Sequence, residues 1–81
     1  MVDKSILERT RKVVADLLKA PVAKVTDKAH MVKELGMVSI QSVELVAALE
    51  EEFDVEIDFD EVAEIYTARE AAEWIEKQLK K

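Results

Sequence analysis

Apolar residues recur along this chain with the period of an α-helix, and no long stretch alternates apolar and polar positions as a half-buried strand would. Three long stripes of this kind predict helices over residues 5–19, 39–53 and 67–79, and a weaker one predicts a short helix over 60–65. The expected fold class is therefore all-α: a small four-helix bundle of three principal helices and one short helix, in a single domain spanning residues 1–81.

Local signals support these helix boundaries. Ser5 and Glu8 have the spacing of a capping box, in which each side chain satisfies a free backbone amide of the other residue. Thr67 and Glu70 repeat this spacing at the start of the last helix. Pro21 stops the first helix, since the residue before a proline avoids helical geometry.

A long connection over residues 20–38 joins the first two expected helices and is not low in complexity. A loop of this length in a compact domain is usually functional or well packed. Its spaced apolar residues are expected to hold it on the core, and Gly36 is expected to supply a backbone conformation that other residues resist. Those apolar residues are Val22, Val25, Ala29, Met31 and Leu35.

The charge of the chain is segregated as well as negative. The net charge is −6, and residues 35–68 hold ten acidic side chains without a single Lys or Arg, whereas residues 1–33 hold eight basic and four acidic ones. Such a surface disfavours nucleic acid and anionic membranes as partners and favours basic protein surfaces. The alternative interpretation is a solvated face that keeps a small domain soluble.

Several other classes are disfavoured by residue type. No apolar run approaches the roughly 18 residues of a membrane span, and the N-terminus lacks the pattern of a signal peptide, so a soluble cytoplasmic protein without membrane insertion is expected. We also expect the protein to be a monomer. The absence of cysteine excludes disulfides and thiolate chemistry. The lone histidine, His30, is expected to be a surface loop residue, and one histidine with one serine makes no catalytic triad. Neither an enzyme nor a metal site is expected.

Ser39 stands at the expected start of the second long helix. Its plain role there is that of an N-cap, because a serine oxygen accepts a hydrogen bond from an early helical amide. The same hydroxyl lies at the positive end of the helix dipole, where an attached phosphodiester would be electrostatically favoured. The position therefore also suits covalent modification by a phosphoryl-type group.

The sequence Leu-Gly-Met-Val-Ser-Ile of residues 35–40 resembles the attachment motif of the acyl carrier protein family, and the similarity covers nearly the whole chain. The resemblance implies a bundle without enzymatic activity. It implies that a phosphopantetheinyl transferase moves 4′-phosphopantetheine from coenzyme A to Ser39, and that acyl intermediates of fatty acid, polyketide or related lipid synthesis are held on this arm as thioesters. The other matching segments are residues 25–27, 43–46, 49–53, 53–57 and 66–71.

The resemblance also implies roles for two further sets of residues. The second helix and its surroundings would dock synthases, reductases and acyltransferases that carry basic patches, with the charges setting encounter rate and specificity. The bundle interior would shelter the acyl chain, although ordinary core packing is the alternative for those residues. The expected docking residues are Val38, Ile40, Gln41, Val43, Glu44, Ala47, Glu50, Glu51, Glu56 and Asp60. The expected acyl-pocket residues are Val32, Leu45, Leu49, Phe53, Ile65 and Ala71.

Two positions depart from the family pattern. Val38 stands where an aspartate usually precedes the serine, and Gln41 stands where an acid is common. The favoured interpretation is a specialised carrier with its own dedicated enzymes; a variant with impaired loading and an unmodified adaptor that only binds partners stay open, as does an aminoacyl cargo. Val38→Asp is expected to change thermal stability little and to speed loading.

Overall fold

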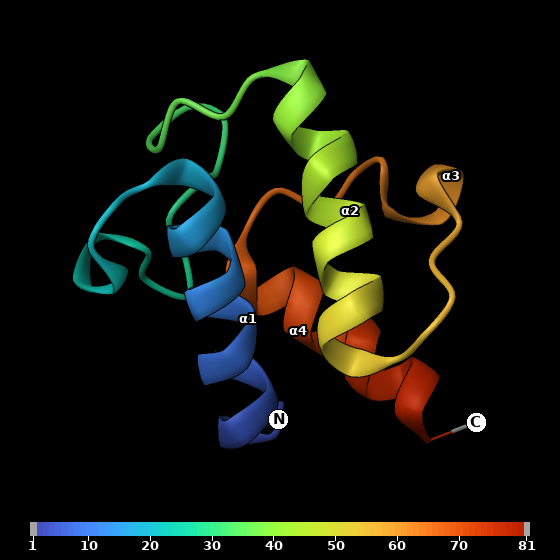
Figure 1. Ribbon diagram of the computed structural model, residues 1–81. Helices are drawn as coiled ribbons and strands as arrows, with labels where there is room; N and C mark the ends of the chain where they lie inside the picture. Colours follow the sequence, from blue (N-terminus) through green and yellow to red (C-terminus); the bar gives the residue numbers. More distant parts are fainter. Residues whose placement is uncertain (1, 81) are drawn as a thin grey trace.

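The computed structural model describes residues 2–80, in which helices pack into a small bundle (Figure 1). The all-α class is confirmed, with three long helices and one short helix among the described residues. The α-helices are α1 (Lys4–Leu18), α2 (Ser39–Phe53), α3 (Phe59–Val62) and α4 (Ala68–Leu79), and a 3₁₀ turn, η1 (Val22–Lys24), lies in the first connection.

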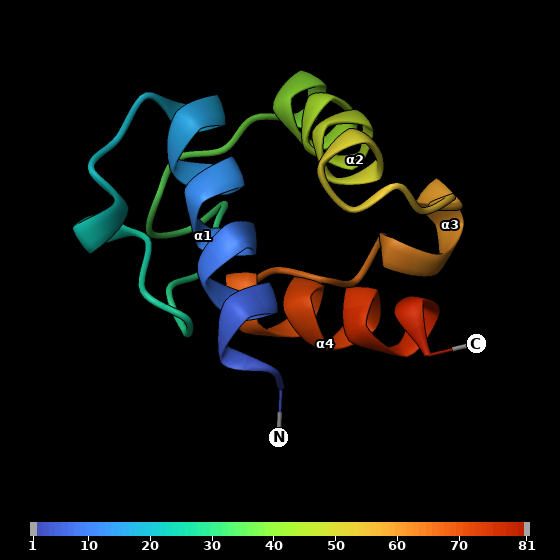
Figure 2. The same ribbon diagram turned by 60° about the horizontal axis from the view of Figure 1, so that its bottom comes forward.

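The core forms where the three long helices meet. Helix α1 packs against both α2 and α4, while α3 lies to one side, near α2 and the C-terminal half of α4 (Figure 2). Apolar side chains from the long connection complete this core, which explains how a loop of that length stays ordered. The buried cluster comprises Val14, Ala15, Val25, Met31, Met37, Leu45, Leu49, Phe53, Ala68, Ala71 and Ile75.

Helix α1 begins one residue earlier than expected, and the predicted capping box there is wrong. The Asp3 carboxylate accepts hydrogen bonds from the amides of Ser5 and Ile6 at 2.8 and 3.2 Å, so Asp3 is the N-cap. Glu8 instead forms an ion pair with Arg11 at 2.7 Å. Aspartate is as good an N-cap as serine, and its charge also complements the helix dipole, which favours the earlier start.

The long connection is held by polar contacts as well as by its buried apolar residues. The Arg11 guanidinium donates to the carbonyls of Val25 and Val22 at 2.6 and 3.1 Å. The side chain of Val22 is itself exposed, so its expected anchoring role is wrong and its carbonyl serves instead. Gly36 has a φ of +74°, which confirms the prediction of a backbone conformation that favours glycine.

His30 organises the second half of this connection. Its Nδ1 accepts hydrogen bonds from the amides of Val32 and Lys33 at 3.2 and 3.0 Å, and its ring stacks on Tyr66 with 4.9 Å between centroids. The Met31 amide also donates to the carbonyl of Tyr66 at 2.7 Å. His30 is thus a half-buried structural residue that ties the loop to the segment before α4.

Helix α3 is shorter than expected and ends at Val62. After a turn, the chain runs back to the loop around His30, where His30 pairs with Thr67 and the Tyr66 carbonyl accepts from the Met31 amide. The capping box at α4 is confirmed: the Glu70 amide donates to the Thr67 hydroxyl at 3.1 Å, and the Thr67 amide donates to the Glu70 carboxylate at 3.2 Å. Within residues 2–80, no helix has both the length and the apolar character that crossing a bilayer requires.

Candidate functional site

Ser39 is the first residue of α2, and Val38 is its N-cap. The expected N-cap role of Ser39 is therefore wrong by one position. Val38 has an extended backbone, and its carbonyl accepts hydrogen bonds from the amides of Gln41 and Ser42 at 2.9 and 3.2 Å. Both features are those of an N-cap residue, so the cap lies one residue before the serine. The side chain of Ser39 is left exposed on the first turn.

The start of α2 is only half capped. The Gln41 side chain accepts from the Val38 amide at 3.0 Å, but the valine side chain has no atom that could accept from the helix in return. The Gln41 amide already donates to the Val38 carbonyl, but the amides of Ser39 and Ile40 before it have no acceptor within the helix, and the helix dipole is positive at this end. An anionic group attached to Ser39 would meet these donors, so the residues present fit a phosphodiester-linked arm.

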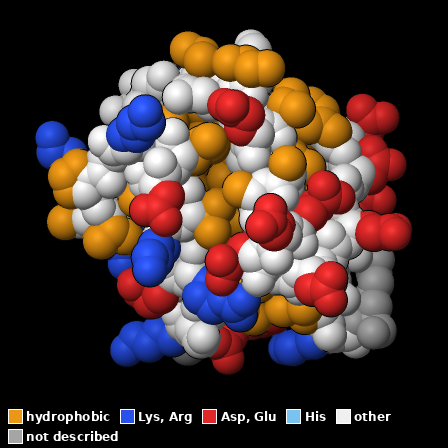
Figure 3. Space-filling view, in the orientation of Figure 1, with side chains coloured by type: hydrophobic (Ala, Val, Ile, Leu, Met, Phe, Trp, Pro, Cys, Tyr) orange, Lys and Arg blue, Asp and Glu red, His pale blue; other side chains and the backbone are white. Residues whose placement is uncertain are grey.

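Ser39 is surrounded by exposed apolar side chains. Val38, Ile40 and Val43 are 56, 64 and 53 % exposed, and we call these three residues the apolar rim. Hydrophobic side chains gather at the end of the molecule where α2 begins, whereas acidic ones gather farther along it and beyond (Figure 3). The surface around α2 is therefore divided into an apolar part beside the serine and an acidic part away from it.

The expected docking acids differ in their exposure and in whether their carboxylates form hydrogen bonds within the protein. Glu44, Glu51, Glu56 and Asp60 are exposed, as is Ala47. Glu50 is half-buried, and its carboxylate accepts from the amide of Ile57 at 2.9 Å. Sequence spacing placed these acids together on one surface, but it contained no signal that separates the engaged carboxylate from the free ones.

Glu52 and Phe53 form a second engaged group at the end of α2. Arg9 of α1 pairs with the Glu52 carboxylate at 2.8 Å, donates to the Glu52 carbonyl at 2.7 Å and lies 4.4 Å from the centre of the Phe53 ring. Phe53 is buried there and does not line the cavity described next. Phe53, which was expected in the acyl pocket, thus belongs to the buried cluster and lies outside this cavity.

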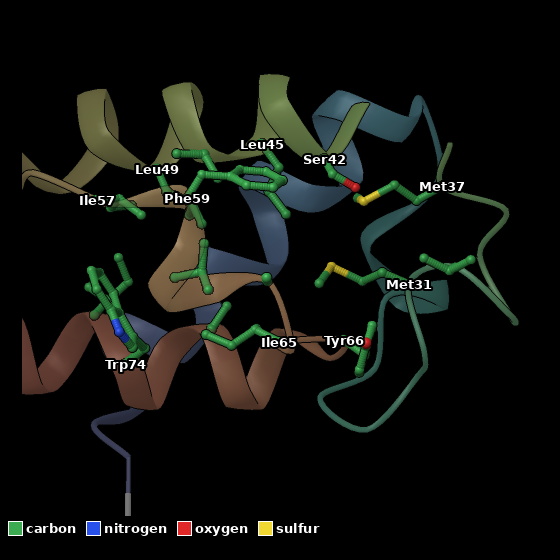
Figure 4. A pocket seen from close by; sticks show the side chains of 16 residues that line it. Met31, Met37, Ser42, Leu45, Leu49, Ile57, Phe59, Ile65, Tyr66 and Trp74 are labelled. Carbon is green, nitrogen blue, oxygen red and sulfur yellow. The ribbon is translucent and has the colours of Figure 1, made fainter. Parts of the chain in front are cut away.

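A cavity of about 110 Å³ lies between α2, α3, α4 and the long connection (Figure 4). Its walls are mainly apolar, and five of the six expected pocket residues contribute to them: Val32, Leu45, Leu49, Ile65 and Ala71. Sequence reasoning missed the others, although the loop methionines carried a usable signal in their apolar spacing. The additional lining residues are Met31, Met37, Ser42, Val46, Ile57, Phe59, Val62, Ala63, Tyr66, Trp74 and Ile75.

One end of the cavity lies toward Ser39 and the other end lies away from it. Ser42 lies three residues after Ser39, hence on the same face of α2, and with Met37 it borders one end of the cavity (Figure 4). Ile57 and Trp74 border the opposite end. For scale, an apolar cavity of about 150 Å³ holds a molecule the size of benzene. The cavity is thus somewhat smaller than that, and its walls are mainly apolar.

Comparisons with known proteins agree with this geometry. A family model described as the phosphopantetheine attachment site matches residues 8–75. The chain is 46 % identical over 74 residues to an acyl carrier protein of Phenylobacterium zucineum, covering 91 % of this chain and 94 % of that protein. It is 49 % identical over 70 residues to an acyl carrier protein of Caulobacter vibrioides, covering 86 and 90 % respectively. The chain thus belongs to the family of acyl carrier proteins, non-catalytic carriers that hold a covalent 4′-phosphopantetheine arm.

Proposed function

We propose that this protein carries fatty acyl, polyketide or related lipid intermediates on an arm attached at Ser39, and that the cavity behind α2 shelters the chain. The observation that carries the proposal is the apolar cavity that begins one helical turn from the exposed serine. The arm supplies a thiol, which this cysteine-free chain lacks. Burial of methylene groups against apolar walls favours a hydrocarbon cargo over an amino acid, whose ammonium group would lose its hydration there.

The proposed partners are a phosphopantetheinyl transferase and the synthases, reductases and acyltransferases that act on the cargo, in the cytoplasm, with the carrier as a monomer. The free acids Glu44, Glu51, Glu56 and Asp60 would meet Arg and Lys on these enzymes. The apolar rim would supply the contact next to the arm, together with Ala47 and Gln41. Because Val38 of this rim stands where the family usually has an aspartate, an apolar surface replaces a charge beside Ser39, which supports a specialised carrier read by dedicated enzymes.

The sheltered cargo can be tested with two neighbouring alanines of α4. Ala71 and Ala72 are both buried, but only Ala71 lines the cavity. Each buried methylene contributes about 0.8 kcal/mol, so an octanoyl chain that buries a few of them should stabilise the arm-bearing protein by roughly 2–3 kcal/mol. We expect Ala71→Leu to remove most of this gain by filling the space.

Thermal unfolding of the arm-bearing and octanoyl forms measures this gain. Ala72→Leu is the matched control: it overpacks a site without a cavity, which costs about 1–3 kcal/mol in both forms and leaves the gain intact. An octanoyl form no more stable than the arm-bearing form would contradict a sheltered chain. An undiminished gain in Ala71→Leu would place the chain elsewhere.

Substitution of Val38 separates helix capping from charge. Because Val38 is the N-cap itself, both Val38→Asn and Val38→Asp supply the missing side-chain acceptor and should raise the free energy of unfolding by about 0.5–2 kcal/mol. This replaces the sequence-based expectation of little change. Only Val38→Asp adds a carboxylate, so only this variant should be loaded faster by a transferase with a basic docking surface.

Urea unfolding and initial loading rates measure the two effects. Equal acceleration by Asn and Asp would mean that cap geometry, rather than charge, limits loading. An unchanged rate in both variants would count against the apolar rim as the feature that restricts this carrier to dedicated partners.

A further inference from the structure

Glu50 differs from the other acids of α2 in what its carboxylate contacts. Its Oε2 accepts a hydrogen bond from the Ile57 amide at 2.9 Å, and its backbone carbonyl accepts from the Val55 amide at 3.3 Å. Asp54, which lies between the end of α2 and Val55, has a left-handed backbone with a φ of 53°. Both hydrogen bonds therefore join the irregular segment after α2 to the last turn of the helix.

Ile57 is the point at which this segment reaches the cavity. Its half-buried side chain lines the end opposite Ser42, facing the region of Trp74 (Figure 4). The segment around it, residues 55–58, is not helical: its two ends are fixed by the bond from the Val55 amide to the Glu50 carbonyl and by Asp58, which caps α3. The position of this wall thus depends on the few contacts that the segment makes, and the bond to the Glu50 carboxylate is a charge-assisted one.

We infer that Glu50 is a positioning residue for the cargo cavity: its carboxylate holds Ile57 in place as the far wall, and this limits how easily water reaches a bound acyl chain. The inference rests on the proposed sheltering of the chain. It assigns Glu50 a role different from that of its neighbour Glu51, which is exposed and has the same charge. The two residues form a natural pair for comparison.

Amide hydrogen exchange in the protein without its arm tests the contact directly. Glu50→Ala removes the acceptor, and the Ile57 amide should then exchange at least about tenfold faster, since hydrogen bonds to charged groups are among the stronger ones. Glu50→Gln keeps a carbonyl oxygen at the same position and should restore most of the protection. Glu51→Ala is the matched control and should leave the Ile57 amide unchanged.

The lifetime of an octanoyl thioester in buffer tests the consequence for the cargo. Glu50→Ala should shorten it severalfold, Glu50→Gln should largely restore it, and Glu51→Ala should not change it. An unchanged Ile57 exchange rate in Glu50→Ala would overturn the inference. Faster exchange with an unchanged thioester lifetime would also overturn it. In that case, the thioester lifetime in Ala71→Leu separates the two proposals. A shorter lifetime in Ala71→Leu would contradict only the role of Glu50, whereas an unchanged lifetime would contradict the sheltered cargo as well.

Discussion

Replacing Ile75 with alanine is expected to lower the free energy of unfolding by about 2–5 kcal/mol. Ile75 is 1 % exposed and belongs to the buried cluster in which α4 packs with α1 and α2. Its side chain also borders the cavity, so truncation enlarges an existing space that the helices cannot easily close. A domain of this length has a total stability of roughly 4–12 kcal/mol, so the substitution removes a large share of it.

Leu79→Ala is the control for this substitution. Leu79 lies one turn later on the same helix but is 46 % exposed, so its loss should cost well under about 1 kcal/mol. Urea unfolding followed by circular dichroism measures both variants. Similar costs for the two positions would contradict the assignment of Ile75 to the centre of the core.

The arrangement of helices could be predicted from sequence because the apolar stripes specify it. The stripe through Leu45 and Leu49 and the capping box at Thr67 each lead to one local structure, and both lie where the sequence places them. The ends of helices were less predictable. At α1, Ser5 and Asp3 are both good N-caps, and only the folded backbone selects between them.

The candidate site also contains residues that the sequence predicted and contacts that it did not. Five of six expected pocket residues line the cavity, since positions on one helical face stay together when helices pack. Phe53 lies outside the cavity, in the buried cluster, and Arg9, distant in sequence, lies over its ring. The contact between Glu50 and Ile57 depends on the path of an irregular segment after α2, which no periodicity encodes. Long-range and loop contacts of this kind required the structure.

Replacing Ser39 with alanine is expected to abolish loading completely, the largest functional effect among these substitutions. The hydroxyl oxygen is the atom to which the arm would be joined, and alanine has none. Ser39 is exposed and is not the N-cap, so its loss should leave the fold intact. Ser42→Ala is the matched control, because it removes the other hydroxyl of the first turn of α2, at the border of the cavity.

The most direct measurement is the intact mass of the folded protein after incubation with coenzyme A and a broad-specificity phosphopantetheinyl transferase, with the modified residue located by peptide mapping. We expect the wild type and Ser42→Ala to gain one phosphopantetheine at Ser39, and Ser39→Ala to gain none. If neither the folded wild type nor folded Val38→Asp, which restores the missing carboxylate, gains any mass, the result would contradict a loaded carrier. It would favour an adaptor that binds partners through its acidic surface. An equal gain in Ser39→Ala would place the arm on another residue.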